Sequence, residues 1–172
     1  MNKKNRNKET PLFTACENGN EPLVKYLVKY EADISKEDNY GETILFKACK
    51  NGNEAVVKYL VEQGADINKE NRNKETPLFT ACENGNEPLV KYLVELGANI
   101  NKENDYGQNP LFIACKYGNK KVEKYLEKRR ENIDRENGND EISFHYAQCI
   151  NGQKTIQYLI EHGAVYCNFY RK

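Results

Sequence analysis

The feature that most constrains the fold is an internal repeat. The 24 residues Asn5–Val28, NRNKETPLFTACENGNEPLVKYLV, recur unchanged at Asn71–Val94, a separation of 66 residues or two periods of 33. The same frame appears as TILFKACKNGNEAVVKYLV at 43–61 and as NPLFIACKYGNKKVEKYL at 109–126. A fixed period of this length is typical of a solenoid, in which each copy contacts mainly its neighbours. We therefore expect one elongated array.

Charge and hydropathy narrow the classes of partner and location. The chain carries 26 basic and 26 acidic side chains and has a pI near 6.7, so no overall field attracts nucleic acid or an anionic membrane. The basic N-terminus is followed by no apolar core of a signal peptide, and no uncharged run approaches the roughly 18 residues of a membrane span. We expect an unsecreted protein without a membrane partner.

Four cysteines follow the period, at Cys16, Cys49, Cys82 and Cys115. Equivalent positions in neighbouring copies should lie as far apart as packed helices, roughly 8–10 Å. A disulfide needs Cα atoms within about 7 Å, so we expect these thiols to stay reduced. Reduced cysteines favour an intracellular location, cytoplasmic or nuclear.

One copy, residues 38–70, shows how the frame predicts a pair of helices. Thr43 is a candidate N-cap for a first helix, and Gly52 stands where a helix commonly ends in a left-handed residue. Asn53 can cap a second helix that Gly64 ends, so the copy forms an antiparallel helix pair followed by a polar, turn-forming loop. Apolar residues at helical spacing supply the buried faces, namely Leu45, Phe46, Ala48, Cys49, Val56, Val57, Tyr59, Leu60 and Val61.

These motifs carry a family resemblance. TPLF with Ala and Cys, then NGN, then LVKYLV, then GAD or GAN with IN, all at period 33, resemble the ankyrin repeat with its TPLH and GADVN signatures. The resemblance implies an all-α solenoid of stacked antiparallel helix pairs with projecting β-turn or hairpin loops. We expect a single domain over 1–172, with copies near 5–37, 38–70, 71–103, 104–136 and 137–169. The first copy should lack a dedicated cap, and the degenerate last copy should act as one.

Positions that never change between copies are predicted to form the core. Three ladders meet this description: Leu12, Leu45, Leu78 and Leu111; Ala15, Ala48, Ala81, Ala114 and Ala147; Tyr26, Tyr59, Tyr92, Tyr125 and Tyr158. The tyrosine ladder could instead form a platform that stacks on bases, but regular aromatic spacing more often reflects packing, which we favour.

Variable positions give the candidate binding site. They lie on the loops and on the exposed side of each first helix, which in ankyrin-like arrays form the concave face where partners usually dock. The alternative is solvated surface that has drifted without a role. The candidates are Asn39, Tyr40, Glu42, Lys50, Asn51, Arg72, Asn73, Glu75, Glu83, Asn84, Asp105, Tyr106, Gln108, Lys116 and Tyr117.

The fourth copy departs from the others in its second helix, predicted over 120–131. Glu123 and Glu127 replace valines, and Arg130 and Glu131 stand where Gly64 and Ala65 stood. A basic helix can contact phosphates, but a charge run is usually a solvated face, so nucleic-acid binding through 116–130 is the less favoured alternative. The basic residues are Lys116, Lys120, Lys121, Lys124, Lys128, Arg129 and Arg130.

The sequence gives no support for catalysis. His145 and His162 are the two histidines, and His145 occupies the histidine place of TPLH, whose role in ankyrin repeats is a structural hydrogen bond. Together with Cys149 and Cys167 they lack the local spacing of a zinc site. Motifs for phosphate, dinucleotide, zinc-protease or nucleophile-elbow chemistry are missing from the sequence. We predict no enzyme, no metal and no cofactor.

The leading hypothesis is a non-catalytic scaffold that binds a protein partner, whose identity the sequence does not give, through the concave face. A second hypothesis is a structural or elastic segment of a longer array, or a scaffold with no evolved partner. We also expect the uncapped first copy to expose apolar surface and to mediate self-association or fray first.

Overall fold

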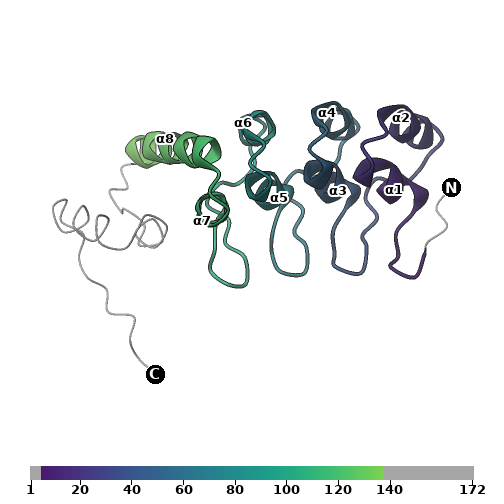
Figure 1. The fold of residues 1–172 in the computed structure, drawn as a ribbon, viewed down its shortest axis with the longest axis horizontal. Helices are drawn as coiled ribbons and strands as arrows, with labels where there is room; N and C mark the ends of the chain where they lie inside the picture. The colour runs from purple at the N-terminus through teal and green to yellow at the C-terminus, as the bar shows by residue number, and fades with distance from the viewer. Residues whose placement is uncertain (1–4, 138–172) are drawn as a thin grey trace, which may run out of the picture.

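The chain folds as two parallel rows of helices. A computed structural model describes the backbone of residues 5–137 and the side chains of residues 5–129. Figure 1 shows the first helix of each copy in one row, the second in the other, and a loop projecting from each first helix. This arrangement confirms the predicted all-α solenoid; the fifth copy, with Ala147, Tyr158 and its cap role, lies outside the described residues. The helices are α1 Pro11–Glu17, α2 Glu21–Lys29, α3 Ile44–Asn51, α4 Glu54–Glu62, α5 Pro77–Glu83, α6 Glu87–Glu95, α7 Pro110–Lys116 and α8 Lys120–Asn137.

The first helices begin at the predicted residues, but the predicted threonine caps are wrong in their side chains. Thr10, Thr43 and Thr76 occupy the N-cap position with extended backbone, yet their hydroxyl oxygens are buried without a hydrogen-bond partner among the described residues. Each is followed three residues later by phenylalanine, where the TPLH signature places a histidine with polar ring nitrogens. In the fourth copy, by contrast, Asn109 accepts a bond of 2.9 Å from the amide of Phe112.

The core confirms two of the predicted ladders. The leucine ladder from Leu12 to Leu111 and the alanine ladder from Ala15 to Ala114 are buried at every described position. Cys16, Cys49 and Cys82 are buried beside them as thiols, and burial raises the pKa of Cys16 to about 12. The apolar faces of the helices therefore meet in one continuous core between the two rows.

The tyrosine ladder belongs to the core only in part: Tyr59, Tyr92 and Tyr125 pack against the core cluster, whereas Tyr26 does not. Tyr26 is 53% exposed and the other described members are half-buried. The tyrosines belong to the second helices, and each of the last three also has a lysine of the preceding copy above its ring. The nitrogen-to-centroid distances are 5.6 Å for Lys25 and Tyr59, 5.6 Å for Lys58 and Tyr92, and 5.7 Å for Lys91 and Tyr125.

Successive loops are joined to one another by backbone hydrogen bonds. Each bond runs from an amide near the tip of one loop to a carbonyl near the tip of the loop before it. The loop row is therefore tied along its whole described length. The bonds are Asn39 N–H to Asn7 O at 3.0 Å, Arg72 N–H to Tyr40 O at 2.9 Å, and Asp105 N–H to Asn73 O at 2.9 Å.

Asparagines between the paired helices join the copies a second time. The side-chain oxygen of Asn86 caps α6 by accepting from Leu89 N–H at 3.1 Å, while its nitrogen donates to Gly52 O at 3.1 Å. Asn53 does the same between its own helix and Gly19 O. Gly52 ends α3 at a φ of 79°, which favours glycine, and a Cβ there would sit 3.4 Å from the Asn86 nitrogen.

The last described helix is longer than predicted. α8 runs from Lys120 to Asn137, beyond the expected end at Glu131. In earlier copies Gly64 and Gly97 follow the second helix with φ values of 89° and 91°. In the first copy Glu31 takes a similar left-handed conformation after α2, at a φ of 62°. Arg130 stands in that position in the fourth copy, so the glycine that follows α4 and α6 is missing there and α8 continues.

Candidate functional site

A cavity opens on the loop side of the array, between α5 and α7. Its volume is about 280 Å³. Six of the fifteen predicted site residues line it, and three lining residues were not predicted. The predicted ones are Glu75, Glu83, Tyr106, Gln108, Lys116 and Tyr117, and the additional ones are Phe79, Thr80 and Ile113.

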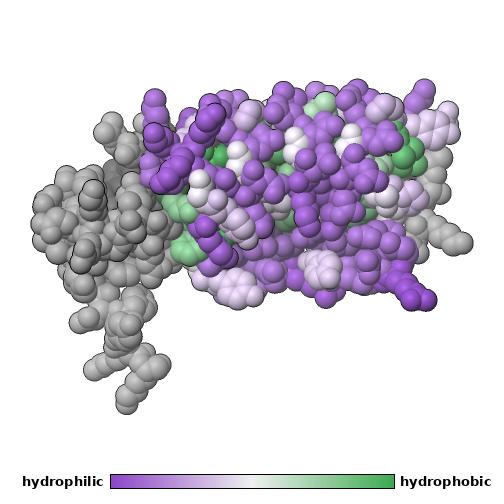
Figure 2. Space-filling view, in the orientation of Figure 1, coloured by the Kyte–Doolittle hydropathy of each residue, from purple (hydrophilic) through white to green (hydrophobic). Residues whose placement is uncertain are grey.

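The cavity has an apolar base and an aromatic rim. Phe79 and Ile113 are buried, whereas Tyr106 is 72% exposed and Tyr117 is 48% exposed. Large aromatic side chains that reach solvent beside a buried apolar base are typical of protein-binding surfaces. Figure 2 shows the face of the array that is turned to the viewer as mostly hydrophilic.

Two carboxylates face this rim without a cation of their own. The hydrogen bond with Glu83, followed by the charge of Glu83, raises the pKa of Tyr117. Glu75 accepts from Asn71 Nδ2 at 3.0 Å and from Asn104 Nδ2 at 3.3 Å. Neither glutamate forms an ion pair with any side chain that the structure describes.

Tyr117 is available at the rim because another residue has taken over a structural bond. In the third copy Asn84, the equivalent of Tyr117, donates to Lys50 O at 2.8 Å and so joins its copy to the one before. In the fourth copy Asn119 donates to the matching carbonyl of Glu83 at 2.8 Å. Position 117 is thereby released from holding the stack and carries an aromatic side chain.

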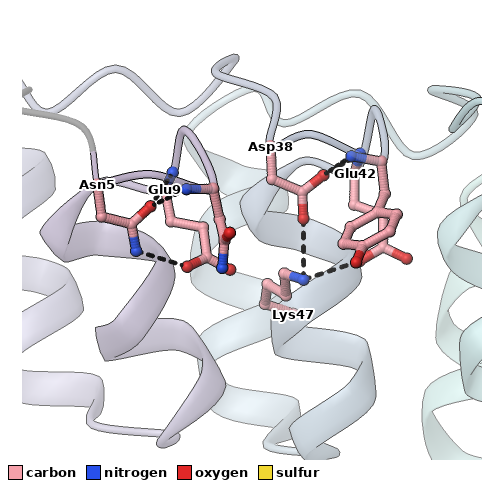
Figure 3. A network of polar contacts seen from close by, with 7 residues as sticks. Asn5, Glu9, Asp38, Glu42 and Lys47 are labelled. Atoms are coloured by element: carbon pink, nitrogen blue, oxygen red, sulfur yellow. Dashed lines mark hydrogen bonds and ion pairs between the residues drawn. The ribbon is translucent and has the colours of Figure 1, made fainter.

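Thr80 lines the cavity in the third copy. The equivalent residue of the second copy is Lys47. Lys47 Nζ lies 2.9 Å from Glu42 Oε2 and 3.0 Å from Asp38 Oδ2 (Figure 3). Burial acts to lower the pKa of Lys47, but the hydrogen bonds and charges of the two carboxylates outweigh it and raise that pKa. Copies one and three have threonine in this place, and copy four has Ile113.

The comparison with protein families agrees with this architecture. A family model for ankyrin repeats, described as three copies, matches residues 1–71 and 67–137. The chain belongs to the ankyrin repeat family. Ankyrin repeats are generally protein–protein interaction modules and are typically non-enzymatic. A search of curated proteins gave no match.

The remaining predicted residues of the ankyrin array lie on the same side but outside the cavity. Several of them hold the stack together: Asn51 Nδ2 donates to Glu17 O at 3.0 Å, and Asp105 pairs with Lys74 at 2.8 Å. Others are joined through their backbone at the loop tips, with the side chain of Tyr40 68% exposed. Outside the cavity lie Asn39, Tyr40, Glu42, Lys50, Asn51, Arg72, Asn73, Asn84 and Asp105.

The basic segment 116–130 is divided between two places in the ankyrin array. Lys116 belongs to the cavity, where its nitrogen lies 5.5 Å from the centroid of the Tyr117 ring. On α8, Lys121, Lys124 and Lys128 are exposed, and Lys120 lies 3.9 Å from Glu123. Lys116 therefore lines the cavity, whereas the exposed lysines of α8 do not.

The part of the chain that the structure describes contains neither a candidate metal site nor a candidate membrane-spanning helix. Among those residues, no group of three or more His, Cys, Asp or Glu side chains could hold a metal ion. The four residues considered for zinc, His145, Cys149, His162 and Cys167, lie outside the described range. None of the described helices is long and apolar enough to cross a membrane.

Proposed function

We propose that this ankyrin protein is a non-catalytic scaffold that binds a protein partner through the face formed by its loops and first helices. The observation that carries the proposal is the cavity between α5 and α7, where Tyr106 and Tyr117 are exposed beside the buried Phe79 and Ile113. Exposed tyrosines around an apolar depression are typical energetic centres of protein interfaces. Binding there requires no metal and no cofactor.

Selection from a displayed library of random dodecapeptides tests this proposal. We expect selected peptides to lose at least tenfold in affinity when both Tyr106 and Tyr117 are replaced by alanine. The matched control replaces Tyr26 on α2 and Tyr30 at the C-cap of α2, which are also exposed but do not line the cavity. If the wild type and both variants bind the peptides with equal affinity, the binding site lies outside this cavity. A wild type that enriches no peptide would contradict the proposal and favour a purely structural role.

A second candidate function is self-association through the first copy. A groove lined by Thr10, Pro11, Thr14 and Leu23, among others, opens at that end, and Figure 2 shows an apolar patch there. Leu23 is 40% exposed, whereas the equivalent Leu89 in an identical segment is fully buried by the preceding copy. The surface that the third copy buries against the copy before it is therefore exposed on the first copy, where a second molecule can pack against it.

Sedimentation velocity tests self-association directly. Leu23→Ser should shift the protein toward monomer, because it removes the largest apolar side chain of the groove. Leu96→Ser is the matched control, since Leu96 is also exposed but follows α6 on the outer row. A wild type that remains monomeric at the highest soluble concentration would rule this function out.

We also infer that the protein works in a reducing compartment. The supporting observation is that Cys16, Cys49 and Cys82 are buried as thiols in separate copies of the array. Mass spectrometry of the protein isolated under thiol-trapping conditions should find these three residues alkylated only after unfolding. Native disulfides among them would contradict the inference.

A further inference from the structure

We propose that the cavity between α5 and α7 receives a basic side chain, lysine or arginine, from the partner protein. This inference rests on the proposed function and specifies the chemistry of the same site. The array itself contains a comparable arrangement. In the second copy, Lys47 occupies the position that lines the cavity in the third copy.

The second copy shows how the loop and first helix hold a cation. Glu42 Oε2 lies 2.9 Å from the ammonium of Lys47, a residue of the following helix, whose side chain is only 9% exposed. The hydrogen bonds of Glu42 and Asp38 keep that lysine charged despite its burial. This geometry shows that the frame can hold an ammonium group close to the glutamate.

The third copy has the same glutamate without the lysine. Glu75 is the equivalent of Glu42, one period later, and Thr80 is the equivalent of Lys47. Both line the cavity, so the volume next to Glu75 is open to a ligand. A basic side chain entering from outside would meet Glu75 as Lys47 meets Glu42, but without a counterpart of Asp38, because Asn71 stands at that position.

The rest of the lining fits a long basic side chain. Its methylene groups can pack on Phe79 and Ile113, since lysine and arginine bury their stems against apolar surface. Its charge can reach Glu83 and the ring of Tyr106, because cations are attracted to aromatic faces within about 6 Å. Lys116 already lies over Tyr117, which leaves Tyr106 as the open ring.

The charge of the cavity favours a cation over an anion. Two glutamates, Glu75 and Glu83, line it against one lysine, Lys116. Neither glutamate has an ion-pair partner among the described side chains, so an incoming cation would meet two carboxylates that no ion pair occupies. An acidic or phosphorylated segment would instead meet two like charges at close range.

The test uses peptides selected from the dodecapeptide library on the wild-type protein. We expect the selected sequences to share a lysine or arginine. Replacing that residue by acetyl-lysine or citrulline, which are neutral and similar in shape, should weaken binding on the order of tenfold. The same loss should follow from the protein variant Glu75→Gln with Glu83→Gln, and wild-type binding should weaken as salt increases.

The identical first copy supplies the matched control. Glu9 and Glu17 are the equivalents of Glu75 and Glu83, so Glu9→Gln with Glu17→Gln makes the same chemical change in the same local sequence. This variant should bind the peptides within about twofold of the wild type. The folded state of both variants is checked by circular dichroism and by their unfolding midpoints.

The outcomes separate this inference from the function on which it rests. Peptides that need Tyr106 and Tyr117 but contain no basic residue, or that bind the Glu75→Gln and Glu83→Gln protein as tightly as the wild type, would overturn the basic-side-chain inference alone. A library that yields no peptide at all would overturn both the inference and the proposed function.

Discussion

Residues 5–28 and 71–94 have one sequence but two environments. Leu23 is 40% exposed and Leu89 is fully buried, and Pro11 is exposed where Pro77 is buried. The helices nevertheless begin and end at equivalent residues in both segments. Local sequence therefore determines the helix pair, whereas the neighbouring copy determines how much of its surface is removed from water.

The largest difference between the two segments is expected when the same leucine side chain is truncated in each of them. Leu89→Ala should lower the free energy of unfolding by about 2–5 kcal/mol, because it leaves a cavity in a closed core. Leu23→Ala should cost less than about 1.5 kcal/mol, since part of that side chain already contacts water. Urea unfolding of both variants measures the difference. Equal costs would mean that the first copy is covered in solution.

The second prediction concerns Lys47, which stands in the copy between the two segments where both segments have threonine. Lys47→Thr should cost about 3 kcal/mol, because Asp38, with its side chain 1% exposed, would keep a buried charge without its cation. Adding Asp38→Asn to Lys47→Thr gives the second copy the asparagine and threonine that the flanking copies have at these two positions. This double variant should recover most of the lost stability. Thermal unfolding of the single and double variants measures the coupling. Additive effects would contradict it.

Amide exchange compares the two segments without any mutation. Because their sequences are identical, equivalent amides have equal intrinsic exchange rates, apart from the first residue. We expect the amides of α1 and α2 to exchange roughly tenfold or more faster than those of α5 and α6, since only the latter pair has copies on both sides. Protection of Ala15 equal to that of Ala81, in a sample shown to be monomeric, would contradict fraying of the first copy.

The smallest expected difference concerns a single amide group. Asn86 caps α6 and also donates to Gly52 O, whereas Asn20 caps α2 and its side-chain nitrogen has no acceptor among the described residues. Asn86→Ala should therefore cost about 1 kcal/mol more than Asn20→Ala, the net value of one hydrogen bond. Urea unfolding of the two variants measures this difference. Indistinguishable costs would show that the bond between copies adds nothing.

The period is enough to predict the family, the helix pairs and the glycines that follow the first helices, because these depend on residues that the four described copies share. The tyrosine ladder shows what a repeated pattern does not contain. A residue at a constant position can face the core or face a lysine of the copy before it, and both explanations require the same period. Tyr59 and Tyr92 do both, because each is half-buried against the core and has a lysine above its ring.

The candidate site was predicted in part for a related reason. Variation between copies pointed to Tyr106, Tyr117 and Glu83, but Thr80 and Ile113 were missed. Their position holds Thr, Lys, Thr and Ile in successive copies, so the signal was present in the sequence. The pattern alone does not place this position in the core or at the surface, because a polar, a charged and an apolar residue alternate there between copies.

The bonds between loop tips have a mechanical consequence. Three backbone bonds of 2.9–3.0 Å tie neighbouring loops together, whereas the second helices meet across the same spacing partly through lysine side chains above tyrosine rings. The loop row should therefore resist stretching more than the outer row does. Under tension the outer row should therefore lengthen more than the loop row, and the array should bend with its loop side on the inside of the curve.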